Sequence, residues 1–258
     1  MTTREPDACS APYRVRFDEA GPDGLLRTSV LLRYAQDLAS YHSAARGFGR
    51  AWYAEQGITW LVRAAEVAVV APVPVGSELV GTTRVVGWRR VWARRRTEFR
   101  RADGALVADV QIDWVLLDAR GTPTRIPTEF DAVFGAPATT LTLGRVVLAE
   151  APNEALTTTL TVRPQELDPM DHVNNAVYAD WLEEAVIAAG GYDDVKSIPR
   201  VVRLDYARAA ESGATVEVVT WREPDGSWSC RIADVAGADL LRARSEPMSD
   251  GPPPSPTP

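Results

Sequence analysis

The stretch that decides the fold spans residues 168–185 and reads Asp168-Pro-Met-Asp-His172-Val-Asn174-Asn175-Ala-Val-Tyr178-Ala-Asp-Trp181-Leu-Glu183-Glu184-Ala. Apolar residues recur in its second part at spacings of three and four, which predicts a helix with one side in a core. The residues of that side are Tyr178, Trp181, Leu182, Ala185, Val186 and Ala189. Asp and Asn before a helix are typical caps. A cap needs one such residue, however, so the surplus indicates a functional cluster of Asp168, His172, Asn174 and Asn175.

Outward from this stretch, the chain repeats itself at an interval of 147 residues. Val15 then aligns with Val162, and Tyr34 with Trp181, without a gap. Each copy predicts a short strand, a turn, a long helix and about four antiparallel strands. The later strands are expected at 58–70, 78–87, 91–101 and 106–117, and again at 201–208, 215–222, 228–234 and 239–244. A lone helix and a lone sheet each need an apolar cover, so each helix is expected to lie across its own sheet.

The polar cluster is not repeated. The first copy has Gly21, Leu25, Arg27 and Thr28 at the positions of Asp168, His172, Asn174 and Asn175. The scaffold is therefore duplicated and the polar groups are not. This asymmetry predicts that the second half carries the chemistry and the first half supplies surface.

The cluster resembles the signature of hot-dog-fold thioesterases, in which an Asp precedes a Gly-His-Val-Asn-Asn-like turn and a central helix with Tyr and Trp. Because there are two copies, the chain is similar to the acyl-ACP thioesterases of plants and bacteria, which are double hot dogs. The first half adds Val15-Arg16-Phe17, Tyr34-Ala-Gln36-Asp and Gly57-Ile-Thr-Trp60, and the resemblance covers about residues 12–245. It implies an α+β fold, a double hot dog of two tandem repeats, each with an antiparallel sheet wrapped around a long central helix.

The chain departs from the family pattern in three places. Asp171 stands at the turn glycine, and Met170 at the Asn of the plant Asp-x-Asn-x-His motif. Alanines stand at the Glu-Cys pair of the plant members, so Glu211 is a possible additional acid only if the strand is shifted by two residues. In one branch of single-hot-dog thioesterases a His occupies the position of Asn175, which supports that residue as a candidate.

The resemblance implies thioester chemistry without a cofactor or metal. A helix start offers unpaired N–H groups and a positive dipole end for the oxygen of a tetrahedral state. Asp168 would attack the carbonyl or activate a water, while His172 and the Asn amides would orient the water or the thioester. Two plainer interpretations stay open: His172 braces the turn, and Asn174 is only the helix cap.

The function expected is hydrolysis of an acyl thioester, foremost acyl-ACP, to release a fatty or polyketide-type carboxylic acid. A coenzyme A thioester is the other expected substrate. The alternatives are an acyl-CoA thioesterase or dehydratase-like enzyme on the same scaffold, or a non-catalytic module that binds acyl carrier protein. Dehydratases usually carry a His on the helix, and none follows Asn175 here. Binding alone would not require Asp168.

The composition excludes several classes of protein. Apolar residues make up 45% and charged residues 24% of the 258 residues, which is typical of a globular chain. The net charge of -7 disfavours nucleic acid as a partner. No apolar run reaches the ~18 residues of a membrane span, so no membrane insertion is expected. Two cysteines and two histidines leave little for disulfides or metal, and a cytoplasmic location is expected.

The domain boundaries follow from the repeat and from proline-rich or featureless stretches. We expect a disordered tail at 1–10, an N-terminal hot-dog domain at 11–134, a linker at 135–152, a catalytic hot-dog domain at 153–247 and a disordered proline-rich tail at 248–258. The molecule is expected to be a monomer or a homodimer of double hot dogs.

A basic run interrupts the acidic chain between residues 89 and 101. If it is a strand, its side chains alternate between two faces. The denser face would hold Arg90, Arg94, Arg96 and Arg100, which we interpret as a docking patch for the acidic acyl carrier protein. The alternative is a solvated strand face beside Trp88 and Trp92.

Overall fold

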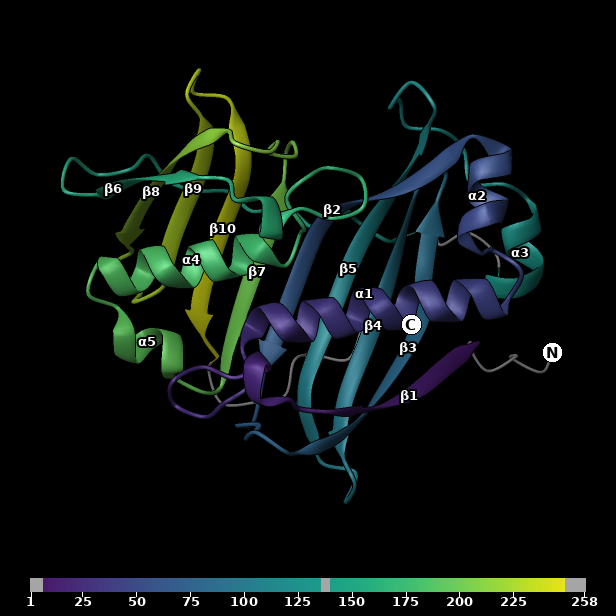
Figure 1. The fold of residues 1–258 in the computed structure, drawn as a ribbon, viewed down its shortest axis with the longest axis horizontal. Coiled ribbons are helices and arrows are strands. Elements are labelled where there is room, and N and C mark those ends of the chain that lie inside the picture. The colour runs from purple at the N-terminus through teal and green to yellow at the C-terminus, as the bar shows by residue number, and fades with distance from the viewer. Residues whose placement is uncertain (1–6, 136–139, 249–258) are drawn as a thin grey trace.

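The computed structural model describes residues 7–135 and 140–248, which form one antiparallel sheet of ten strands with helices packed on it (Figure 1). The strands are β1 (Ala8–Arg14), β2 (Ile58–Val69), β3 (Glu78–Arg89), β4 (Trp92–Arg101), β5 (Leu106–Asp118), β6 (Leu156–Thr161), β7 (Arg200–Tyr206), β8 (Thr215–Arg222), β9 (Trp228–Asp234) and β10 (Asp239–Pro247). The helices are α1 (Thr28–Ala45), α2 (Arg50–Gln56), α3 (Glu129–Phe134), α4 (Val177–Ala188) and α5 (Tyr192–Lys196), with short turns η1 (Phe17–Glu19) and η2 (Pro164–Glu166).

The strand order is β1-β3-β4-β5-β2-β7-β10-β9-β8-β6. The two halves of the chain therefore meet where β2 pairs with β7, in a register that places Val67 opposite Val202. Strands 215–222 and 228–234 match the sequence prediction at both ends, and the other predicted strands differ by a few residues. The α+β class with a large antiparallel sheet is confirmed.

The two long helices lie on the same face of the sheet, one over each half (Figure 1). The predicted apolar sides are the sides that are buried: Leu31 and Leu38 of α1 and Tyr178 and Leu182 of α4 are all at most 1% exposed. Burying a side chain of this size contributes about 1.5–3 kcal/mol. The helices therefore hold to the sheet mainly through this apolar contact.

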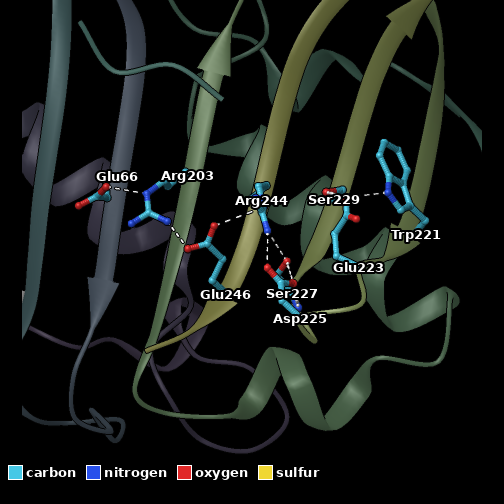
Figure 2. A network of polar contacts seen from close by, with 9 residues as sticks. All are labelled: Glu66, Arg203, Trp221, Glu223, Asp225, Ser227, Ser229, Arg244 and Glu246. Atoms are coloured by element: carbon cyan, nitrogen blue, oxygen red, sulfur yellow. Dashed lines mark hydrogen bonds and ion pairs between the residues drawn. The ribbon is translucent and has the colours of Figure 1, made fainter. Parts of the chain in front are cut away.

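The other face of the sheet is polar. Val202 and Leu204 of β7 belong to the core under the helices, so the alternate residues Arg203 and Asp205 point the other way. Arg203 donates to Glu66 of β2 at 2.8 Å and also binds Glu246 of β10. Figure 2 shows this network continuing through Arg244 to Asp225 and Ser227, with Trp221, Glu223 and Ser229 beside it. The ion pair between Arg203 and Glu66 joins the two halves of the chain.

The segment between the halves is tied to this polar face. The Gly144 N–H donates to Asp113 Oδ2 at 2.7 Å, and the Thr142 carbonyl accepts from Arg94 at 3.0 Å. Further along, the Val146 N–H donates to Asp205 at 3.4 Å. Residues 140–155 form no helix or strand, and side chains of the sheet hold their backbone. Residues 136–139 of the expected linker lie outside the described residues.

Part of the expected N-terminal tail is ordered structure. Residues 8–10 belong to β1, where Ala8 lies opposite Arg84 of β3. Asp7 binds Arg46 and His42 near the end of α1. The expectation of a tail up to residue 10 is therefore wrong for 8–10, because an edge strand of small residues has no apolar pattern. Residues 1–6 and 249–258, the rest of the expected tails, lie outside the described residues.

Candidate functional site

The turn before α4 is closed by its own backbone. The Asp168 N–H donates to the His172 carbonyl at 2.8 Å, and the Asp171 N–H donates to the Asp168 carbonyl at 3.0 Å. Asp171 has a φ of 61°, in the left-handed region that glycine favours and Asp tolerates. This explains how Asp171 can stand where the resembling thioesterases have glycine.

The same turn fixes the Asp168 carboxylate. Its Oδ1 accepts the Met170 N–H at 2.8 Å, which is the local bond of an Asx turn. The residue is partly buried, and it lines a cavity of about 120 Å³ together with His172. The carboxylate is thus oriented by the backbone and faces a space that a substrate atom can enter.

At the start of α4, three backbone donors are bonded and one is not. The N–H groups of Asn174, Ala176 and Val177 donate to the Glu166 carbonyl, Asn174 Oδ1 and the Asn174 carbonyl, at 2.9 Å each. The Asn175 N–H makes no hydrogen bond with the described residues. Asn174 therefore caps the turn that leads into α4, and Asn175, a lining residue of the cavity, leaves a backbone donor unbonded.

Two tyrosines that line the cavity form hydrogen bonds close to the start of α4. The Tyr206 hydroxyl donates to the Asn175 carbonyl at 2.8 Å, and the Tyr178 hydroxyl accepts the Ala210 N–H at 3.0 Å. Burial raises the pKa of Tyr178 to about 12 and that of Tyr206 well above its usual value. Both phenols are therefore neutral at physiological pH and serve as fixed hydrogen-bonding groups.

The cavity brings together three of the four predicted catalytic residues, Asp168, His172 and Asn175. Asn174 is not among its lining residues. Glu211 is exposed and is also outside the lining; its backbone bridges to His172, and Ala209 lines the cavity instead. The first half contributes lining residues that sequence reasoning did not include in the site, namely Gln36, Trp60, Leu61, Val62 and Trp114.

A larger cavity of about 360 Å³ adjoins the first, and Trp60 and Trp114 line both. Its other aromatic lining residues come from the first half: Phe48, Tyr53, Trp88, Phe130 and Phe134. A volume of this size falls in the range of pockets that hold small organic ligands, about 300–1,000 Å³. The aromatic clustering was missed because these residues come from β3, from the loop between α1 and α2, and from two short helices that the sequence pattern did not predict.

The equivalent position in the first half is filled by side chains. Thr28 aligns with Asn175, and its hydroxyl donates to Glu183 Oε1 at 2.5 Å and accepts from Arg200 at 2.9 Å. Glu183 and Arg200 are also within 3.6 Å of each other. Burial raises the pKa of Glu183. This end of the molecule is a packed polar contact between the two halves.

The basic run is mostly neutralised within the sheet. Arg94 pairs with Asp113 at 2.6 and 2.7 Å, and Arg96 pairs with Asp109. Arg100 lies 3.4 Å from Glu98. Arg90 has a φ of 33° in the turn before β4, so it is not in the strand as expected. Arg96 is buried and Arg94 is partly buried, and each forms an ion pair, so replacing either arginine by an acid would disrupt the sheet as well as any docking surface.

The described residues contain neither a metal-binding cluster nor a membrane-spanning helix. No group of three or more His, Cys, Asp or Glu side chains is arranged to hold a metal ion. None of the described helices combines the length and apolar character needed to cross a membrane. Cys9 and Cys230 are both free, and Cys230 is buried in β9.

Comparison with known proteins finds the same fold in proteins described as thioesterases. The chain superposes on a protein described as an oleoyl thioesterase from Lactobacillus plantarum with a TM-score of 0.83 and 20% identity, over 95% of this chain and 98% of that one. For the 12:0-ACP thioesterase from Umbellularia californica the TM-score is 0.77 and the identity 22%, over 93% and 96% of the two chains. An uncharacterised protein of Mycobacterium tuberculosis is 24% identical over 220 residues, which cover 84% of this chain and 83% of the relative.

Two family models divide the chain between them. Residues 6–134 match the N-terminal domain of acyl-ACP thioesterases, and residues 149–246 match the C-terminal domain. The chain belongs to the acyl-ACP thioesterase family, and it is a thioester hydrolase.

Proposed function

We propose that Asp168 is the acid on which this thioesterase depends, and that it works with His172 and the start of α4. The observation that carries the proposal is the cavity in which the Asp168 carboxylate, held by the Met170 N–H, shares one small space with His172 and Asn175. Asp168 either attacks the thioester carbonyl or takes a proton from an attacking water. Either path ends with the free acid and the carrier thiol.

The tetrahedral oxygen would sit at the start of α4. The Asn175 N–H makes no bond with the described residues and lies at the positive end of the helix dipole. A donor aimed at developing negative charge stabilises the transition state more than the ground state. The Asn175 side chain is held by Gln36, since its Nδ2 donates to Gln36 Oε1 at 3.4 Å. His172 is placed to orient the attacking water or the departing sulfur.

The acyl chain would extend from this site into the larger cavity of the first half. Trp60 and Trp114 line both cavities, so the two spaces adjoin at their side chains. An aromatic wall suits an acyl chain because burial removes apolar surface from water. In this account the second half carries out the chemistry, and the first half binds the acyl group.

We also infer that the two halves are tandem copies of one hot-dog unit. The strand order is the same when read inward from either end of the sheet, with β6–β10 matching β1–β5 in sequence. Contacts across the junction repeat as well. Thr28 binds Glu183, and their partners 147 residues away, Asn175 and Gln36, bind each other. This is the pattern expected of two units related by an approximate twofold axis.

The substrate assignment is tested by a panel of acyl-ACP and acyl-CoA thioesters of increasing chain length, assayed for released thiol. We expect kcat/KM to be higher for the carrier-bound thioester than for the matching coenzyme A thioester. Both carriers present the same thioester, so this difference isolates recognition of the protein partner. Equal values for every pair would favour an acyl-CoA thioesterase. We place the reaction in the cytoplasm, because two free cysteines fit a reducing compartment. We place it in fatty acid biosynthesis because the chain belongs to the acyl-ACP thioesterase family.

A further inference from the structure

One buried arginine of the larger cavity has no acid beside it. Arg95 of β4 is 8% exposed and lines this cavity. Its Nη1 donates to His42 Nδ1 and its Nη2 donates to Ser43 Oγ, each at 2.9 Å. In the part of the chain that the structure describes, no carboxylate forms an ion pair with its guanidinium. The neighbouring Arg94 and Arg96 each have one.

The acid that His42 links to Arg95 is Asp7, and Asp7 is already paired with Arg46. Because His42 Nδ1 accepts from Arg95, the proton of a neutral ring is on Nε2, which lies 2.9 Å from Asp7 Oδ2. Burial lowers the pKa of His42, which keeps the ring neutral. Asp7 is bound by Arg46, whose Nε donates to it at 2.7 Å. Asp7 therefore contacts Arg46 and His42 and does not pair with Arg95, whose guanidinium lies over the Phe134 ring at 5.6 Å and has no carboxylate partner among the described residues.

A buried guanidinium without an acid is costly unless a ligand completes its surroundings. Burial lowers the pKa of Arg95 to about 10, so the group is still charged at neutral pH. A second donor lies in the same cavity. The Tyr53 hydroxyl is buried beside the polar groups of Ser43 and Trp60, but it makes no hydrogen bond of good geometry with the described residues. The Arg95 guanidinium and the Tyr53 hydroxyl can each donate a hydrogen bond to an oxygen of a ligand.

We propose that the larger cavity binds an acyl chain that carries an oxygen acceptor far from the thioester, and that Arg95 and Tyr53 bind this oxygen. The acceptor is a keto, hydroxyl or carboxylate oxygen, and the substrate is an oxygenated acyl thioester and not a plain saturated one. The inference rests on the proposed function, in which the acyl chain enters this cavity. A guanidinium has five N–H donors, and two hydrogen bonds to His42 and Ser43 leave others for a ligand.

The helix α1 gives the distance of the oxygen from the thioester. Gln36 lines the cavity that contains Asp168, and Ser43, which binds Arg95, lines the larger one. Seven residues of helix correspond to ~10 Å at a rise of 1.5 Å per residue. A fully extended chain covers that length in roughly eight or nine bonds, taking three bonds per 3.3–3.6 Å. The acceptor is therefore expected near the eighth or ninth carbon.

The test uses carrier-bound decanoyl, 9-hydroxydecanoyl, 9-oxodecanoyl and nonanedioyl thioesters with the full-length protein. We expect kcat/KM to be about tenfold to hundredfold higher for an oxygenated chain than for decanoyl, the range for a hydrogen bond to a charged group. Arg95→Met should remove this preference, and Tyr53→Phe should reduce it. Arg101→Met is the matched control, since this arginine of the same strand donates to the Pro72 carbonyl and lines neither cavity. The nonanedioyl arm separates a carboxylate from a neutral oxygen.

Equal kcat/KM for decanoyl and all oxygenated chains in the unaltered protein would overturn the inference. An Arg95→Met variant whose kcat/KM falls by the same factor for decanoyl and for the oxygenated chains would also overturn it. If no thioester of any kind is hydrolysed, the proposed function fails instead. Binding of the neutral methyl esters to the unaltered protein, followed by quenching of tryptophan fluorescence, needs no variant and brings no carboxylate that could itself bind Arg95. Tighter binding of methyl 9-oxodecanoate than methyl decanoate, by about tenfold or more, supports the inference, and equal binding contradicts it.

Discussion

At the scale of single residues, the neighbouring Asn174 and Asn175 have different roles. Asn174 Oδ1 accepts the Ala176 N–H, while Asn175 lines the cavity and leaves its own N–H unbonded by the described residues. Losing a capping side chain costs about 1 kcal/mol. We expect Asn174→Ala to lower the free energy of unfolding by about that amount. Asn175→Ala keeps the backbone N–H and removes only the side chain bound to Gln36, so we expect little change in stability and a fall in kcat of no more than about tenfold. Denaturant unfolding and thiol-release assays on both variants measure this, and identical behaviour would contradict the division.

The sequence predicted these residues because their types and spacing exceeded what a cap needs. It could not place Asn174 outside the cavity, since the two asparagines differ only in the direction of their side chains. Gln36 and Trp114 belong to the cavity lining because the first half packs against the second, and no local pattern marks that contact. His42 belongs to no sequence motif, yet it is 1% exposed and lies between Asp7 and Arg95.

At the scale of elements, Gly191 allows α4 and α5 to approach the sheet. A Cβ at this position would lie 2.6 Å from Val186 and 2.6 Å from the Trp228 ring. Overpacking of this kind typically costs about 1–3 kcal/mol. We expect Gly191→Ala to lower the free energy of unfolding within that range. Gly49→Ala is the control, because its Cβ would meet only Ala44 at 3.8 Å. A Gly191→Ala protein as stable as the Gly49→Ala protein would show that the contact is not tight.

The start of β1 is attached to the end of α1 through Asp7. The side-chain hydrogen bond from Arg46 holds the pKa of Asp7 at about 2, below its usual 3.8. A depressed pKa stabilises the fold above the unfolded value, and this stability is lost as the pH falls from about 4 towards 2. Allowing for solvent screening, we expect about 1 kcal/mol. Unfolding of the unaltered and Asp7→Asn proteins should differ by this amount at pH 6 and converge near pH 2. A constant difference would contradict the assignment.

At the scale of the whole molecule, the strand boundaries and the asymmetry between the halves could be predicted from the sequence. The larger cavity in the first half could not. Periodicity marks β8 and β9 to the residue, because turn residues flank both. The larger cavity depends on how α2 and α3 close over β2–β5, and short helices leave little pattern in a sequence. The basic run was interpreted as a surface because its partners Asp109 and Asp113 lie on the next strand.

The central claim is that Asp168 carries the thioesterase chemistry, and one measurement tests it most directly. Asp168→Asn keeps the size of the side chain and removes its charge, and Asp171→Asn makes the same change on the exposed acid of the same turn. With an acyl-ACP substrate, we expect Asp168→Asn to lower kcat by about 10² or more and Asp171→Asn to leave it within a few-fold. Both proteins should unfold like the unaltered chain. An Asp168→Asn protein that turns over acyl-ACP at the unaltered rate would contradict the account.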